Sequence, residues 1–96
     1  MKVQPFYFTS YNNVIGVAGS IRELDLEMKR QSREDRACLE YHLASGNIVR
    51  WLEYAGEPEL ANDLRGVSGA DEAILLVEKY VARAVMLHRM RRGRMR

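Results

Sequence analysis

The chain opens with apolar and polar positions in alternation. Within residues 3–10, Phe6 and Phe8 share one face of an extended segment, and Tyr7 and Thr9 share the other. A period of two in aromatic and β-branched residues predicts a β-strand with one buried face.

A turn and a second strand are predicted next. Residues 11–13 read Tyr-Asn-Asn, and asparagine tolerates the positive φ that tight hairpin turns require. Residues 14–18, Val-Ile-Gly-Val-Ala, then form the returning strand. Because an isolated hairpin is only marginally stable, we expect helices to cover one of its faces.

From residue 20 onward the apolar residues recur three or four positions apart, which predicts helices. The first covers about 20–30 and begins at Ser20, which pairs with Glu23 in a capping-box pattern. The second covers about 32–44, with acids in its first turn, and Gly46 provides a left-handed stop.

Two short helices are predicted in the middle of the chain. Asn47 caps the first, which ends at Gly56, and Pro58 occupies the first turn of the second, which ends before Gly66. The apolar residues on these helices are Ile48, Trp51, Leu52, Tyr54, Leu60, Ala61 and Leu64.

The last predicted helix is the longest. Ser68 and Asp71 mark its start, its period holds over about 70–92, and Gly93 is its expected end. Its apolar positions are Ala73, Ile74, Leu76, Val77, Tyr80, Val81, Ala84, Val85 and Leu87. This stripe is wider than one core face needs. Either the helix crosses the middle of the domain, or its far side contacts a partner or a second copy.

Together these elements predict an α+β, mainly helical fold, in which an N-terminal β-hairpin packs on four to five helices and the last helix is long. Ninety-six residues suit a single core. We expect a compact domain over residues 1–88 and a separate basic C-terminal tail over residues 89–96.

Charge distinguishes that tail from the body. Residues 1–88 contain ten Lys and Arg against thirteen Asp and Glu, a net charge of −3, whereas residues 89–96 contain five Arg and no acid, a net charge of +5. Like charges this dense repel one another and favour an extended tail unless an anion neutralises them. Clustered arginines match phosphate, because each guanidinium donates in a planar fork.

The favoured interpretation is a non-catalytic, RNA-associated structural protein, either a ribosomal protein or a ribosome-associated factor. Its partner would be structured RNA, ribosomal RNA above all, with ribosomal proteins or self as further contacts. The residues predicted to bind RNA are Arg83, Arg89, Arg91, Arg92, Arg94 and Arg96. The alternative is a protein–protein adaptor or homodimer that uses the apolar last helix.

The sequence gives little support for a metal site, a catalytic cysteine or a nucleotide site. Cys38 and His42 share a helix face, but half of a zinc site is missing, and a cysteine hydrolase would lack an orienting group. We expect a buried thiol and an imidazole that bonds the last carbonyls of its helix. Residues 66–69 resemble a phosphate-binding turn but lack the lysine and the spacing. No cofactor, metal or small-molecule substrate is expected.

Four aromatic residues, Phe6, Tyr7, Tyr11 and Trp51, could stack on a base. Trp51 lies on an apolar face and is expected in the core, whereas Tyr7 and Tyr11 are expected on the exposed face of the hairpin. Without an apolar leader, a membrane-length segment or a second cysteine, the chain is expected to be cytoplasmic.

Five short motifs follow one another between Phe6 and Val67: Phe6-Tyr7-Phe8, Ser20-Ile21-Arg22-Glu23-Leu24, Tyr41-His42-Leu43-Ala44-Ser45-Gly46, Trp51-Leu52 and Glu59-Leu60-Ala61. In these motifs, which span about two thirds of the chain, the sequence resembles a family of small archaeal domains of unknown function. Asn47-Ile48 departs from the family, whose members often have Asp-Phe there. The resemblance implies this architecture and an archaeal source, which we expect to be thermophilic. It implies no activity and no site residues.

Overall fold

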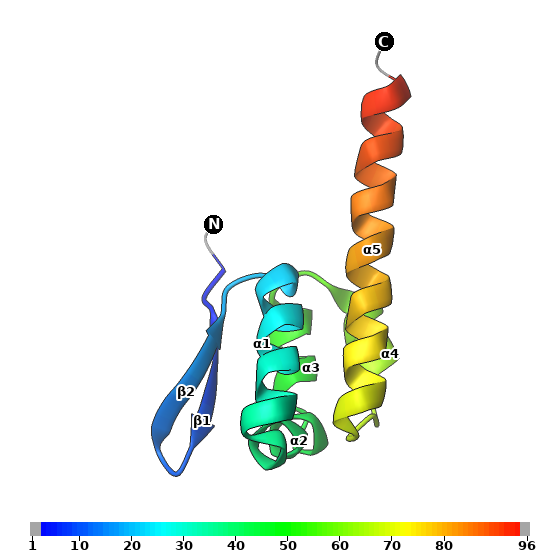
Figure 1. Cartoon of the computed structure of the whole chain (residues 1–96). Coiled ribbons are helices and arrows are strands. Elements are labelled where there is room, and N and C mark those ends of the chain that lie inside the picture. The colour runs from blue at the N-terminus through cyan, green and yellow to red at the C-terminus, as the bar shows by residue number, and fades with distance from the viewer. Residues whose placement is uncertain (1–2, 95–96) are drawn as a thin grey trace.

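The structure, a computed structural model, describes the backbone of residues 3–94 and the side chains of residues 3–87. Its elements in chain order are β1 (Phe6–Ser10), β2 (Asn13–Ala18), α1 (Ile21–Glu34), α2 (Arg36–Ala44), α3 (Asn47–Tyr54), α4 (Pro58–Leu64) and α5 (Ala70–Arg94). The hairpin lies on one side of α1 and the long α5 on the other (Figure 1). The predicted α+β, mainly helical fold with an N-terminal hairpin is confirmed.

The hairpin has one buried and one exposed face, as the alternation predicted. Phe8 is fully buried, whereas Tyr7 is exposed. The strands pair antiparallel, with a register shift between Phe8 and Thr9. The turn consists of Tyr11 and Asn12, which both have positive φ, of 51° and 69°, so β2 begins one residue earlier than predicted.

The first helix begins at the predicted capping box. The Ser20 hydroxyl accepts a hydrogen bond from the Glu23 N–H at 3.1 Å. The Glu23 carboxylate in turn accepts from the Gly19 N–H at 2.7 Å. These two bonds satisfy N–H groups that have no partner within the helix.

The boundary between α1 and α2 was predicted wrongly. The helix α1 continues to Glu34, and the Ser32 hydroxyl, within it, donates to the Lys29 carbonyl. Asp35 is the N-cap of α2, because its Oδ1 accepts from the Cys38 N–H at 3.2 Å. A carboxylate is a strong N-cap, and here it lies three residues after the predicted start of the helix at about residue 32.

Glycines mark the ends of α2 and α3. Gly46 and Gly56 adopt left-handed φ values of 80° and 84° just after α2 and α3, as expected for helix stops. Gly93 does not stop the last helix, which includes it and ends at Arg94. That part of the prediction was wrong.

One apolar core joins the inner face of the hairpin to the helices. Its fully buried members include Phe8, Leu24, Leu39, Leu52 and Leu60. Among the described side chains of α5, those of the first turns contribute, through Ala70, Ala73 and Val77, and residues 82–87 are all exposed. The helix therefore packs against the body over about its first three turns and then leaves it.

Candidate functional site

The C-terminal half of α5 projects past the rest of the fold (Figure 1). We call residues 82–94 the arm. At 1.5 Å per residue it extends about 20 Å, and the molecule as a whole measures 52 × 29 × 22 Å. The predicted basic tail thus begins inside a helix, with no break in the backbone between residues 88 and 89.

Of the six arginines predicted to bind RNA, Arg83 is exposed on the arm. The backbone positions of Arg89, Arg91, Arg92 and Arg94 are helical and not extended. At 100° per residue these four positions are spread around the helix axis. Their side chains, and Arg96 entirely, lie outside the described residues.

The base of the arm is fixed by polar contacts. The Tyr80 hydroxyl donates to Glu57 Oε1 at 2.6 Å, which links α5 to the start of α4. This hydrogen bond, followed by burial, raises the pKa of Tyr80 to about 12. Lys29 of α1 contacts Glu78 of α5 at 2.8 Å and Asp25 at 3.2 Å, and these contacts raise the pKa of the lysine.

The beginning of α5 is already occupied by an acidic side chain. Glu40 Oε2 accepts from the Ala70 N–H at 2.9 Å. Arg36 contacts both Glu40, at 3.5 Å, and Asp71, at 3.0 Å, and Asp71 is the main cause of the raised pKa of Arg36. Because Glu40 takes the place that an anion would occupy at this helix start, residues 66–69 are a poor phosphate site.

His42 is buried in the core and does not cap its helix, so that expectation was wrong. Its Nε2 lies 3.0 Å from the Thr9 O and 3.1 Å from the Thr9 N, and its Nδ1 lies 3.1 Å from Asn47 Nδ2. Cys38 is buried as well, with Sγ 3.5 Å from the same Thr9 carbonyl. Burial, aided by the charge of Asp35, raises the pKa of Cys38, which disfavours a reactive thiolate.

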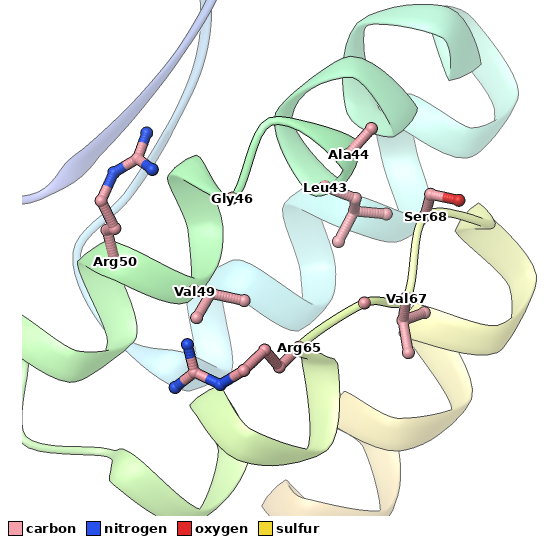
Figure 2. Close-up of a pocket in the computed structure, with 9 residues that line it drawn as sticks. Leu43, Ala44, Gly46, Val49, Arg50, Arg65, Val67 and Ser68 are labelled. Atoms are coloured by element: carbon pink, nitrogen blue, oxygen red, sulfur yellow. The ribbon is translucent and has the colours of Figure 1, made fainter.

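A pocket of about 400 Å³ lies between the end of α2, the start of α3 and the loop before α5. Figure 2 shows two cationic side chains, Arg50 and Arg65, and the apolar side chains of Leu43, Val49 and Val67. Arg65 contacts Glu53 at 2.9 Å, and Arg50 donates to the side chain of Asn47. The lining residues are Leu43, Ala44, Gly46, Val49, Arg50, Arg65, Gly66, Val67 and Ser68. Both arginines of this pocket are therefore already bound to other side chains of the protein.

A larger pocket of about 590 Å³ separates the tip of the hairpin from α2. We call it the hairpin pocket. Thr9, Ser10, Tyr11 and Asn12 line it from the hairpin, and Asp35, Ala37, Cys38 and Tyr41 line it from the other side. Sequence reasoning missed this site, because the two groups of residues are more than twenty positions apart.

The aromatic residues considered for base stacking differ in burial. Trp51 is in the core, and its indole N–H donates to the Gln4 carbonyl at 2.8 Å, so the expected packing role is confirmed. Tyr7 and Tyr11 are both exposed, as expected, and Tyr11 alone of the two lines the hairpin pocket.

Within the described residues, no three His, Cys, Asp or Glu side chains form a group that could hold a metal ion. In the same part of the chain, no helix is long and apolar enough to cross a membrane. No family model, curated protein or solved structure matches the chain. The resemblance to small archaeal domains therefore stays a prediction.

Proposed function

We propose that this chain is a non-catalytic, RNA-associated structural protein of the cytoplasm, a ribosomal protein or ribosome-associated factor whose basic tail binds RNA phosphates. The observation that carries the proposal is the position of that tail. Of the five arginines within residues 89–96, four lie on the last turns of a helix that projects from a body with a net charge of −3. A projecting cationic helix can enter a groove or loop of RNA while the acidic body stays outside.

Fixation of the arm's base supports this proposal. The contacts of Tyr80 with Glu57 and of Lys29 with Glu78 hold α5 on the body just before it projects. A binding helix that is already oriented loses less conformational freedom on association than a free tail. Phosphate binding by arginine is also strong, because charge-assisted, bidentate hydrogen bonds form.

Salt dependence of binding to a structured RNA tests the proposal. Five phosphate contacts, at about 0.7–0.9 each, predict that log K falls with log salt with a slope of roughly −3.5 to −4.5. Replacing all five tail arginines with glutamine should abolish binding at moderate salt, as should deletion of residues 89–96. The same five positions changed to lysine keep the charge and should retain the slope while lowering affinity.

A matched control uses arginines of the body. Arg22 and Arg33 are exposed on α1 and contact no acid within the described part of the chain. Changing both to glutamine should leave the RNA affinity and the salt slope nearly unchanged. Equal binding by the wild type and the five-glutamine variant would refute the proposal.

A second candidate function, self-association or protein binding through the arm, is favoured by one specific observation. Val85, Met86 and Leu87 are exposed, with exposed fractions of 37%, 64% and 52%, on the part of α5 that leaves the body. Sedimentation at micromolar concentration tests this candidate. A monomer whose mass does not change with concentration would contradict a homodimer and leave RNA as the partner of the arm.

A further inference from the structure

Tyr11 lies at the tip of the hairpin in a backbone conformation that disfavours tyrosine. Its φ is +51°, in the left-handed region, where the Cβ of an L-residue comes too close to the following carbonyl oxygen. Two-residue turns with two positive φ values prefer asparagine and glycine. The Tyr11 side chain is 97% exposed, so packing hardly compensates for this strain.

A strained residue that contributes little to the fold is expected where its side chain serves a function. The neighbourhood of Tyr11 supports that interpretation. The register shift between Phe8 and Thr9 lies close to the tip, and irregularities of this kind are common beside functional sites. Cys38 and His42 contact the carbonyl of Thr9 and so fix the shifted segment.

A second exposed tyrosine lines the same pocket from α2. Tyr41 has an exposed fraction of 63%, and its ring meets the His42 ring edge-to-face with a centroid distance of 5.3 Å. His42 is buried and is bound to Thr9 and Asn47. Tyr41 is therefore supported from behind while its ring remains accessible from the pocket.

The polar groups of the hairpin pocket favour a ligand that donates hydrogen bonds. Asp35 Oδ1 caps α2, while Oδ2 makes no hydrogen bond or ion pair within the described residues. Ser10 and Asn12 add a hydroxyl and an amide, and no Lys or Arg among the described side chains lines the pocket. A carboxylate without a cation repels phosphate but accepts from the amino or imino groups of a nucleobase.

We propose that the hairpin pocket binds one unpaired nucleobase of an RNA strand. The base stacks on Tyr11 and Tyr41, and the Asp35 carboxylate accepts from its exocyclic amino group. Stacking of splayed bases on aromatic side chains is the usual mode of single-strand RNA recognition. The inference depends on the proposed partner class, RNA, but places a second contact on the body, away from the basic tail.

The test titrates the full chain into a single-stranded pentaribonucleotide with 2-aminopurine at its centre, whose fluorescence is quenched when it stacks. We expect saturable quenching by the wild type. Tyr11→Asn and Tyr41→Ala should each weaken binding by about 5-fold to 150-fold, the range for loss of one base–aromatic stack. Tyr7→Ala is the matched control, since Tyr7 is an exposed hairpin tyrosine outside the pocket, and should bind as the wild type does.

Asp35→Asn tests recognition of the amino group. Asparagine keeps the N-cap of α2 but removes the negative charge. The wild type should prefer the aminopurine strand to one with unsubstituted purine at its centre, and the variant should lose that preference. A preference retained in Asp35→Asn would overturn the assigned role of the carboxylate.

Two further comparisons separate this proposal from the function of the tail. The full-length variant with five glutamines in place of the tail arginines should still quench 2-aminopurine, even if the tail proves not to bind RNA. The free 2-aminopurine nucleoside should bind more weakly than the strand, and equal affinity would mean a free nucleoside, not an RNA base, is the ligand. If Tyr11→Asn, which relieves strain and therefore folds, binds the strand as well as the wild type, the proposal is overturned.

Discussion

Replacement of His42 by leucine should lower the free energy of unfolding much more than a substitution on the surface of a helix would. The ring is 3% exposed and connects the hairpin, through Thr9, to Asn47 at the start of α3. Arg50 can only donate, so Asn47 presents its Oδ1 to Arg50 and its Nδ2 to the ring. Nδ1 of the ring therefore accepts from Asn47, and the proton of the imidazole is on Nε2, which donates it to the Thr9 carbonyl. Because Nε2 donates, it cannot also accept from the Thr9 N–H, so that 3.1 Å contact is not a hydrogen bond.

The expected loss follows from these contacts. The two hydrogen bonds are part-buried and contribute about 1 kcal/mol each. Leucine retains most of the apolar contact but loses the edge-to-face packing with Phe6 and Phe8, at centroid distances of 5.5 and 5.7 Å. We expect the free energy of unfolding to fall by about 2–4 kcal/mol, which lowers Tm by roughly 10–30 °C.

Urea unfolding followed by circular dichroism measures this loss. The partner variant Asn47→Ala removes one of the two bonds and should cost about 1 kcal/mol. In a double-mutant cycle His42→Leu should cost about 1 kcal/mol less when Asn47 is already alanine, because the shared bond is gone. The reasoning is refuted if His42→Leu changes stability by less than about 0.5 kcal/mol, as a surface substitution would.

Three other predictions concern single groups. Glu40→Ala removes the acceptor for the Ala70 N–H at the start of α5 and should cost about 1 kcal/mol in urea unfolding; an unchanged midpoint would contradict it. The pKa of Tyr80 is raised to about 12 by its bond to Glu57, so the native state keeps this proton more tightly. The stability difference between the wild type and Tyr80→Phe should be full below about pH 10 and vanish by about pH 12; a difference constant across this range would count against the assignment. Burial raises the pKa of Cys38, so a thiol reagent should modify it more slowly than free cysteine and rapidly in urea, and an equally fast native reaction would exclude this environment.

Most of the fold could be predicted because its determinants are local. The capping pair of Ser20 and Glu23, the left-handed Gly46 and the proline of α4 each act within a few residues of the boundary that they set. The last turn of α1 also has a tertiary contact. Arg30, which contacts Glu34 within the helix, donates to the Ile15 carbonyl of β2 at 2.6 Å, and no sequence period encodes this second bond.

The candidate sites were less predictable for a related reason. The clustered positive charge of the tail is visible in the sequence. That the tail belongs to a helix projecting from the body is seen only in the structure, where α5 leaves the core after Val81. His42 was expected to bond its own helix, whereas packing turns its ring toward Thr9. Tyr11 and Tyr41 line one pocket because the hairpin lies against α2, a contact between segments thirty residues apart.

The two proposed RNA contacts lie at opposite ends of the molecule. Figure 1 places the hairpin turn and α2 at one end and the C-terminal end of α5 at the other, and the long dimension of the molecule is 52 Å. A short RNA stem can therefore reach only one contact, whereas an RNA that also carries a distant unpaired strand can reach both and gains affinity by avidity. Tyr11→Asn should then weaken binding of the long RNA and leave a short stem unaffected, while the five-glutamine variant should weaken both. If Tyr11→Asn weakens both RNAs equally, the two contacts do not act on separate parts of one RNA, and the arrangement inferred from the fold is wrong.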